Sequence, residues 1–185
     1  MKIAVYSGSF NPLHIGHLAI IRYLTQEAGY DLVYLVVTPQ NPFKQTHSLP
    51  TGVDRFNAAV EAVSRYPDLK VKVEDIELEM TPPQYTIRTL DTLKAREPEN
   101  EFTLVIGADN LACFQGWLYH ERILREYGVV VYPRKGYHRG YARARLLKED
   151  PSYKITLIKA PLVTISSTEI RKARDSGIDM SKWLM

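Results

Sequence analysis

Six short apolar runs alternate with segments of helical length, and this alternation most constrains what the chain can fold into. The runs, rich in β-branched residues, lie at 3–6, 32–37, 71–76, 102–106, 129–132 and 155–158, and the helix-length segments lie at 18–28, 55–66, 87–96, 119–127 and 168–175. Continuous apolar runs are typical of strands that are buried on both faces of a sheet. The alternation therefore predicts the α/β class, with a doubly wound parallel sheet whose crossovers are right-handed.

The expected ligand site is at the carboxyl edge of this sheet, because ligands of open parallel sheets bind in the crevice beyond the strand ends. No apolar run is followed by G-x-x-x-x-G-K-[ST] or G-x-G-x-x-G, so a P-loop and a dinucleotide-binding fingerprint are excluded. No repeat, low-complexity tract or interdomain linker interrupts the pattern. We therefore expect a single domain over residues 1–185.

Composition narrows the class of protein. With 185 residues, 45% hydrophobic and 24% charged, the chain can bury a core without disulfides or a structural metal. No apolar run approaches the ~20 residues of a membrane span, and the N-terminus lacks the pattern of a signal peptide. We therefore expect a cytoplasmic protein with no membrane partner. The single cysteine, Cys113, lies in an apolar stretch, where a buried and inert thiol is expected.

A basic segment at residues 134–148, RKGYHRGYARARLLK, contrasts with the small net charge of +3. Basic residues interspersed with aromatic ones can bind RNA. The same pattern is typical of a solvated helix that follows a loop, and we favour this second interpretation because the overall charge is too small for general nucleic-acid binding. We therefore expect no nucleic-acid partner, and a charge that suits substrates bearing several phosphates.

The loop after the first apolar run, SGSFNPLHIGH at residues 7–17, has the features of an anion-binding site. Gly8 lets the backbone turn sharply or come close to a ligand. The N–H groups near Ser9 and Phe10 can then surround an anion. The loop ends where apolar residues resume at helical spacing, so it leads into a helix start.

Two histidines lie at this helix start. His14 and His17 are three residues apart, which places both imidazoles on one face, close to the positive end of the helix dipole. Together with backbone donors they can bind phosphate oxygens and stabilise the charge of a five-coordinate phosphorus. Two alternatives stay open. The pair could ligate a metal, although no third histidine or nearby carboxylate completes a site, or either ring could be purely structural.

The last loop, TISSTEIR at residues 164–171, is a second candidate anion site. Ser166 and Glu169 have the spacing of a helix capping box, which by itself could be the whole role of Ser166. A helix start that carries hydroxyls nevertheless suits an anion. Arg171 also places a cation where the helix dipole disfavours one unless an anion is bound. If both loops lie at the same edge of the sheet, they face each other across one site.

The two loops together resemble the nucleotidyltransferase superfamily, whose marks are H-x-G-H early in the chain and I-S-S-T-x-[IL]-R late in it. Within that superfamily the sequence is similar to the bacterial nicotinate-nucleotide adenylyltransferases. Three further segments carry the similarity: TPQNPFK at 38–44, PQYT at 83–86 and IGADNL at 106–111. Nearly the whole chain is covered, and the resemblance implies a Rossmann-like nucleotidyltransferase fold.

The resemblance also implies a reaction and its site. The family transfers AMP from ATP to nicotinate mononucleotide and releases pyrophosphate, with Mg²⁺ held mainly by substrate phosphates and not by a protein metal site. The ATP-binding residues would be Ser9, Phe10, His14, His17, Gly107, Asp109, Arg134, Ser166, Ser167 and Arg171, of which His14, His17 and Arg171 would act in catalysis. The mononucleotide-binding residues would be Asn41, Lys44, Tyr85, Thr86 and Trp117.

Rival functions come from two classes. Pantetheine-phosphate adenylyltransferases and cytidylyltransferases share the H-x-G-H loop, but Trp117 and the Tyr85–Thr86 pair favour the nicotinate enzyme. A nucleotide-sensing or RNA-binding module that transfers nothing is the alternative of another class, and the presence of both histidines and Arg171 argues against it. Gln84 stands where the family often has serine, at the rim of the expected pyridine pocket.

Overall fold

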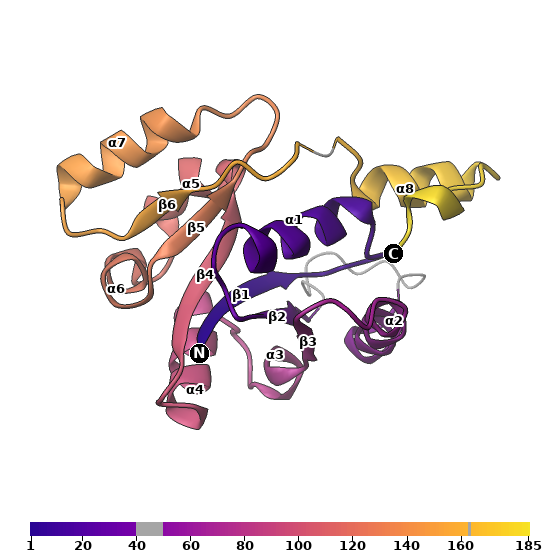
Figure 1. The fold of residues 1–185 in the computed structure, drawn as a ribbon, viewed down its shortest axis with the longest axis horizontal. Helices are drawn as coiled ribbons and strands as arrows, with labels where there is room; N and C mark the ends of the chain where they lie inside the picture. Colours follow the sequence, from indigo (N-terminus) through magenta and orange to yellow (C-terminus); the bar gives the residue numbers. More distant parts are fainter. Residues whose placement is uncertain (40–49, 163) are drawn as a thin grey trace.

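A computed structural model describes residues 1–39, 50–162 and 164–185, and a parallel sheet of six strands forms its centre (Figure 1). The strands are β1 (Lys2–Gly8), β2 (Leu32–Val37), β3 (Val71–Glu74), β4 (Glu101–Gly107), β5 (Val129–Tyr132) and β6 (Ile155–Leu157). Their order is β3-β2-β1-β4-β5-β6, and every neighbouring pair is parallel. The predicted doubly wound parallel sheet is confirmed. The chain runs from β1 outward to β2 and β3 and then crosses back to β4 on the other side of β1. The crevice between the carboxyl ends of β1 and β4 is therefore the switch point, where such folds bind ligands.

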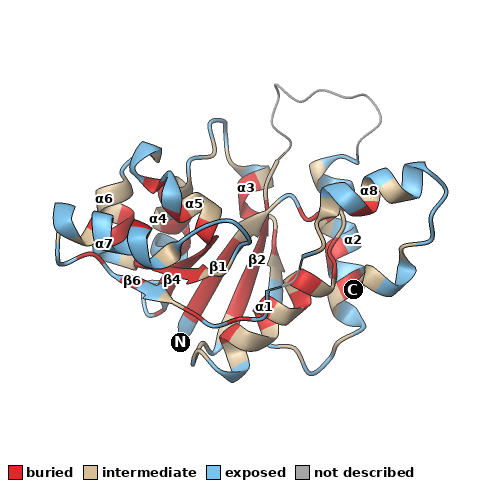
Figure 2. Ribbon diagram, turned by 90° about the horizontal axis from the view of Figure 1, so that it is seen from above, coloured by how far each residue is buried: buried red, intermediate tan, exposed pale blue. Residues whose placement is uncertain are grey.

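Helices cover both faces of the sheet. They are α1 (Ile15–Gln26), α2 (Gly52–Ser64), α3 (Ile76–Glu79), α4 (Thr86–Arg96), α5 (Ala108–Ala112), α6 (His120–Arg122), α7 (Arg139–Glu149) and α8 (Ser167–Asp175), with short helical turns η2 (Phe114–Gly116), η3 (Ile123–Tyr127) and η4 (Ser181–Trp183). Side chains of α1 and α2 form one buried cluster with the sheet, and those of α3, α4, α5 and α7 form a second. Figure 2 shows that the strands at the centre of the fold are mostly buried, whereas many helix residues are exposed. Among the described residues, none of the helices combines the length and hydropathy that crossing a membrane requires.

Successive side chains of a strand point to opposite faces of the sheet, so neighbouring residues of a strand belong to different buried clusters. In β1, Ile3 and Val5 lie in the cluster that includes α4, while Ala4 and Tyr6 lie in the cluster that includes α1. The last residues of β1 therefore present their side chains to opposite faces in turn. Tyr6 consequently lies on the face where the first loop folds back into α1.

Two predicted segments differ from the structure. The run at 71–76 ends as a strand at Glu74, because Ile76 already begins α3. The segment at 119–127 is not one regular helix. Tyr119 has a positive φ of 54°, so α6 begins only at His120 and passes into the π-helical η3. A positive φ cannot be read from tyrosine in the sequence, because the residue seldom adopts one.

The prediction of a buried Cys113 is wrong. Cys113 is exposed at the end of α5, because the neighbouring Leu111 and Phe114 take the buried positions. Its Sγ atom lies 3.6 Å from the carbonyl oxygens of Asp109 and Asn110. The thiol therefore faces solvent despite its apolar neighbours in the sequence.

The basic segment forms a loop followed by α7, as the favoured interpretation predicted. The three arginines of α7 are bound to the main chain. Arg139 donates from Nη1 to the carbonyls of Val131 and Ile158, at the ends of β5 and β6. Arg143 and Arg145 donate to further main-chain carbonyls over 2.9 and 2.8 Å. Arg139 and Arg143 thus hold α7 on the sheet and Arg145 holds it against α5, so these three cations have a structural role, which weakens the RNA-binding interpretation.

We expect Arg139→Ala to lower the free energy of unfolding by about 1.5 to 3 kcal/mol, the usual contribution of hydrogen bonds from a charged donor. Lys148→Ala is the matched control, because Lys148 is an exposed cation of the same helix and should change stability by less than about 0.5 kcal/mol. Urea unfolding followed by circular dichroism measures both. Equal stabilities of the two variants would contradict the role given to Arg139.

Candidate active site

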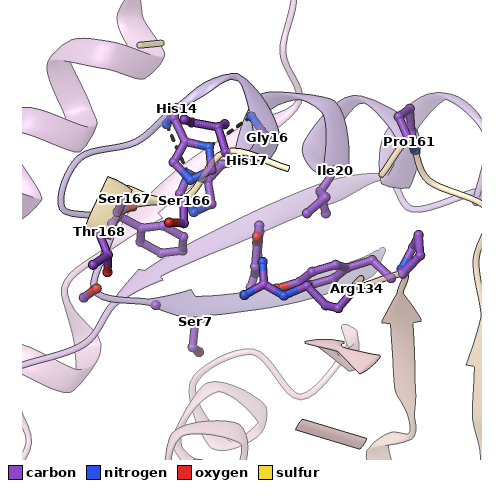
Figure 3. A pocket seen from close by; sticks show the side chains of 17 residues that line it. Ser7, His14, Gly16, His17, Ile20, Arg134, Pro161, Ser166, Ser167 and Thr168 are labelled. Carbon is purple, nitrogen blue, oxygen red and sulfur yellow. Dashed lines mark hydrogen bonds between the residues drawn. The ribbon is translucent and has the colours of Figure 1, made fainter. Parts of the chain in front are cut away.

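A cavity of about 270 Å³ lies beyond the carboxyl ends of β1 and β5 (Figure 3). It is lined by the loop after β1, the start of α1, the loop after β5 and the start of α8. The predicted site residues that the structure brings together there are Ser9, Phe10, His14, His17, Arg134, Ser166 and Ser167. The first and last loops of the chain therefore face each other across one cavity, as the sequence predicted.

The two histidine rings are bound to the helix start that carries them. His14 is the N-cap of α1, and its Nδ1 accepts the N–H of Gly16 over 3.0 Å. The Nδ1 of His17 accepts the N–H of His14 over 3.1 Å, and the two ring centroids lie 3.7 Å apart. A neutral imidazole whose Nδ1 accepts must carry its proton on Nε2. Both rings can therefore donate a hydrogen bond from Nε2 to a ligand in the cavity.

Burial keeps these two rings uncharged. It lowers the pKa of His14 from 6.5 to about 4, and the positive charge of Arg134 adds to the effect. Burial likewise lowers the pKa of His17 well below its ordinary value, and the neighbouring His14 and Arg134 lower it further. At neutral pH both rings act as neutral donors. They can stabilise charge on a phosphate without transferring a proton to it.

The loop between β1 and α1 depends on a close contact at Gly8. A side chain there would place its Cβ 3.0 Å from the Phe10 ring, which is buried against Tyr6 and His17. Phe10 has a φ of 45°, a conformation that costs free energy for a bulky residue. Gly8 was predicted to allow a sharp turn or a ligand, and the structure shows that it makes room for Phe10. The strained turn keeps the Phe10 ring against that of His17 and leaves Ser9 exposed.

The start of α8 is bound to the first loop. Ser166 is the N-cap of α8: its Oγ accepts the N–H of Glu169 over 3.2 Å and donates to the Glu169 carboxylate over 2.7 Å. Ser167 donates from Oγ to the Pro12 carbonyl over 2.9 Å. The predicted cap at Ser166 is thus present. The neighbouring hydroxyl of Ser167 connects two loops that are far apart in the sequence.

Arg171 also contacts the first loop. Its Nη1 donates to the Asn11 carbonyl over 2.6 Å, and its Nη2 donates to Thr168 Oγ1 over 3.2 Å. Arg171 does not line the cavity. Its place near a helix start, which the sequence could explain only through a bound anion, is explained equally by the Asn11 carbonyl.

A second cavity of about 250 Å³ adjoins the first and shares Arg134, Ile165 and Ser166 with it. Asp109 lines it, and the Asp109 Oδ1 atom is buried without a hydrogen-bond partner among the described residues. Arg134 Nε lies 3.5 Å from that oxygen. A Cβ at Gly107 would lie only 2.4 Å from it, so glycine is required for this arrangement. This carboxylate oxygen, which has no hydrogen bond of its own, can accept one from a ligand hydroxyl.

The predicted mononucleotide residues lie elsewhere. Thr86 begins α4 after Tyr85, whose side chain does not cap the helix, and the N–H groups of Thr86 and Ile87 have no partner among the described residues. Trp117 follows η2 and packs on the ring of Phe114 with 4.8 Å between centroids, in the buried cluster that includes α4. None of these residues lines the two cavities described above. The other two predicted residues, Asn41 and Lys44, lie outside the described residues.

Sequence reasoning missed two tyrosines of the first cavity. Tyr6 and Tyr132 line it with ring centroids 5.9 Å apart. Burial, with the closeness of Tyr132, raises the pKa of Tyr6, so its hydroxyl stays protonated and polar. Both residues end or nearly end an apolar run of the sequence. An aromatic residue at the carboxyl end of a predicted strand was the available signal.

We expect the acid sensitivity of folding to depend on His14. Between pH 6.5 and about 4 the unfolded chain binds a proton at His14 that the folded chain does not bind. The free energy of unfolding should therefore fall as the pH drops through this range, by up to about 1.4 kcal/mol per pH unit for each such histidine. His14→Asn keeps an N-cap acceptor but cannot titrate, so its slope should be smaller.

Urea unfolding measured from pH 4 to pH 7 tests this expectation. His138→Asn is the matched control, because His138 caps α7 through the same ring nitrogen but is exposed. The pH slope should be smaller in His14→Asn than in this control. A wild-type slope in His14→Asn would show that the ring is not held neutral by burial.

Comparison with known proteins identifies the relatives of this chain. The family model described as cytidylyltransferase-like matches residues 5–173. A protein of Bacteroides fragilis (strain YCH46) named probable nicotinate-nucleotide adenylyltransferase is 40% identical over 183 residues, which cover 99% of this chain and 87% of that protein. A protein of the same name from Cytophaga hutchinsonii is 40% identical over 171 residues, covering 92% of this chain and 84% of the relative.

A solved structure supports the fold. Nicotinic acid mononucleotide adenylyltransferase of Plasmodium falciparum, complexed with NaAD, superposes with a TM-score of 0.76 at 24% identity, over 97% of this chain and 86% of that one. The Rossmann-like nucleotidyltransferase fold implied by the sequence is thus confirmed. Taken with the family match and the two facing loops, these similarities show that the chain belongs to the cytidylyltransferase-like family, among its nicotinate-nucleotide adenylyltransferases.

Proposed function

We propose that this protein is an adenylyltransferase that joins the AMP part of ATP to nicotinate mononucleotide, giving nicotinate adenine dinucleotide and pyrophosphate. The observation that carries the proposal is the pair of neutral imidazoles, each with Nδ1 occupied by the start of α1 and Nε2 left to donate. Such donors stabilise charge that develops on a phosphorus undergoing substitution. The two most similar relatives described above carry the name of this activity.

The reaction needs little more than positioning and charge stabilisation. A phosphate oxygen of the mononucleotide attacks the α-phosphorus of ATP in line, and the bond from that phosphorus to the β-phosphate oxygen breaks. The electron pair leaves with pyrophosphate, and no covalent bond to the protein forms. His14 and His17 donate to oxygens that gain charge as the phosphorus becomes five-coordinate.

The remaining ATP contacts follow from the two cavities. Ser9 and Phe10 would add main-chain donors beside the histidines, and Ser166 and Ser167 would hold the triphosphate from the start of α8. Arg171, bound to the first loop, would support the same group from behind. In the second cavity the Asp109 oxygen that lacks a hydrogen bond would accept from the ribose near Gly107, and Arg134 would border the adenine.

The mononucleotide is proposed to bind at the same carboxyl edge of the sheet, on the face opposite to α1. Thr86 and Tyr85 at the start of α4 and the ring of Trp117 would form the pyridine pocket. Asn41 and Lys44 would bind its phosphate. Trp117 is half-buried and in contact with Phe114, so its ring is fixed in place for stacking.

Magnesium fits the donor set of the site when it is held by substrate. The described residues that line the first cavity offer imidazole, hydroxyl, main-chain and guanidinium groups, and none is a carboxylate. Magnesium favours oxygen ligands and keeps several waters, so substrate phosphates would be its main ligands here. When bound, the ion neutralises phosphate charge.

Two predictions from the sequence, a single domain over residues 1–185 and a cytoplasmic location, stay predictions.

The activity is tested with the whole chain, ATP and Mg²⁺ against a panel of phosphate acceptors, with pyrophosphate release as the readout. Nicotinate mononucleotide should react fastest. Faster reaction of pantetheine phosphate, or of CTP with a phosphorylated alcohol, would assign the chain to a sister activity. Nucleotide binding without pyrophosphate release from any acceptor would favour the non-catalytic alternative.

We expect His17→Gln to lower kcat by about 100-fold while the protein stays folded, because a glutamine amide whose oxygen accepts the His14 N–H no longer holds its N–H donor at the position of the imidazole Nε2. Glutamine at this helix position keeps an acceptor for the His14 N–H, so stability should stay within about 0.5 kcal/mol of the wild type. His17→Ala removes both interactions and should also lose about 1 kcal/mol of stability. A folded His17→Gln with near-normal kcat would show that His17 does not take part in the reaction.

We expect nicotinate mononucleotide to be preferred over nicotinamide mononucleotide by at least about tenfold in kcat/KM. The unpaired N–H groups at the start of α4 favour a carboxylate, which accepts from them, over a carboxamide, which presents its own donor. Both constants are measured at saturating ATP. Gln84→Ser is the control, because the Gln84 amide already donates to the Met80 carbonyl and should contribute little. Equal constants would refute this donor pocket and leave the ATP assignment untouched.

A further inference from the structure

A buried arginine joins the ends of the two strands that carry the substrate loops. Arg55, in the first turn of α2, is only 3% exposed. Its Nη1 donates to the Ser9 carbonyl over 2.7 Å and to the Thr38 carbonyl over 2.8 Å. Ser9 belongs to the first loop, and Thr38 is the first residue after β2. A single nitrogen atom thus connects both loops.

The strand ends need such a donor because the regular pairing of β1 with β2 stops there. The last paired residues are Gly8 and Val37, and Thr38 N–H still donates to the Gly8 carbonyl over 2.9 Å. The Ser9 and Thr38 carbonyls receive hydrogen bonds from Arg55 instead.

The charge of this side chain is costly at its position. Burial lowers the pKa of Arg55, and no carboxylate forms an ion pair with it among the described residues. The adjacent Asp54 instead accepts from Thr51 at the helix N-cap. Arg55 Nη2 is also buried without a hydrogen-bond partner in the described ranges. A buried cation that lacks a counterion lowers stability, so its presence at a ligand-binding edge points to a role in function.

We propose that Arg55 is a positioning residue for adenylyl transfer, which sets the first loop relative to the chain that leaves β2. The inference rests on the proposed function, in which the first loop binds ATP phosphates and the chain after β2 binds the phosphate of the mononucleotide. In-line attack requires that the mononucleotide phosphate and the α-phosphate of ATP lie at a defined distance and angle to each other. Misplacement by about 1 Å can cost about 100-fold in rate, so an arginine that touches neither substrate can still govern kcat.

The test compares Arg55→Met and Arg55→Lys with Arg65→Met in the whole chain. Arg65 is the matched control: it lies one residue beyond α2, its side chain is 56% exposed, and it pairs with Glu61. Arg55→Met should lower kcat at least about tenfold while each KM changes less than about threefold. Arg55→Lys keeps a shorter donor and should recover part of the rate. Arg65→Met should retain kcat within about twofold.

All rates are measured at a temperature where circular dichroism shows each variant folded, and are expressed per folded molecule. A third variant, Arg55→Ala, is assayed with and without millimolar guanidinium chloride, against equal sodium chloride. Guanidinium should restore part of kcat by filling the vacated space. This arm keeps the proposal testable if Arg55→Met does not fold.

Four results would overturn the proposal. They are a folded Arg55→Met with normal kcat, activity loss that only follows the unfolded fraction, no recovery by lysine or guanidinium, and a rise in one KM at unchanged kcat. The last would make Arg55 a direct substrate ligand. A wild-type protein that releases no pyrophosphate from any acceptor refutes the proposed function and this inference with it. An active wild type with normal Arg55 variants refutes this inference alone.

Discussion

The hydrogen bonds between two imidazole rings and the first turn of α1 are the interaction on which the site depends. Main-chain N–H groups occupy both Nδ1 atoms, so the orientation of each ring and the place of its proton are set before a ligand arrives. Burial then keeps His14 and His17 neutral beside the cation Arg134. The site is therefore preorganised for phosphate charge, and it gains this property from the same bonds that begin a helix.

The rest of the structure holds that helix start in place. The first loop is bound by Ser167 and Arg171 of α8 through its Pro12 and Asn11 carbonyls, and His14 forms an isolated bridge with Leu184. Contacts from the last twenty or so residues thus immobilise the loop that follows the first strand. Figure 1 shows α8 beside the start of α1. These contacts explain how the first loop can stay ordered although Phe10 in it has a strained backbone conformation.

Arginines satisfy carbonyls where neighbouring parallel strands end. Arg139 bridges the ends of β5 and β6, and Arg55 bridges the chains that leave β1 and β2. Parallel strands that separate toward different loops leave carbonyls unpaired, and a long forked cation can reach two of them at once. Basic residues of this chain therefore bind main-chain carbonyls at the edge of the sheet, in addition to any anionic substrate.

The sequence by itself determined the features that depend on residues within one helical turn or along one strand. These include the alternation of strand and helix, the facing imidazoles of His14 and His17, and the cap at Ser166. Only the tertiary structure decided the exposure of Cys113 and the partners of Arg55 and Arg171. Arg55 meets a carbonyl 17 residues away and Arg171 one 160 residues away. Local patterns cannot specify such contacts, because they exist only after the sheet has brought distant strand ends to one edge.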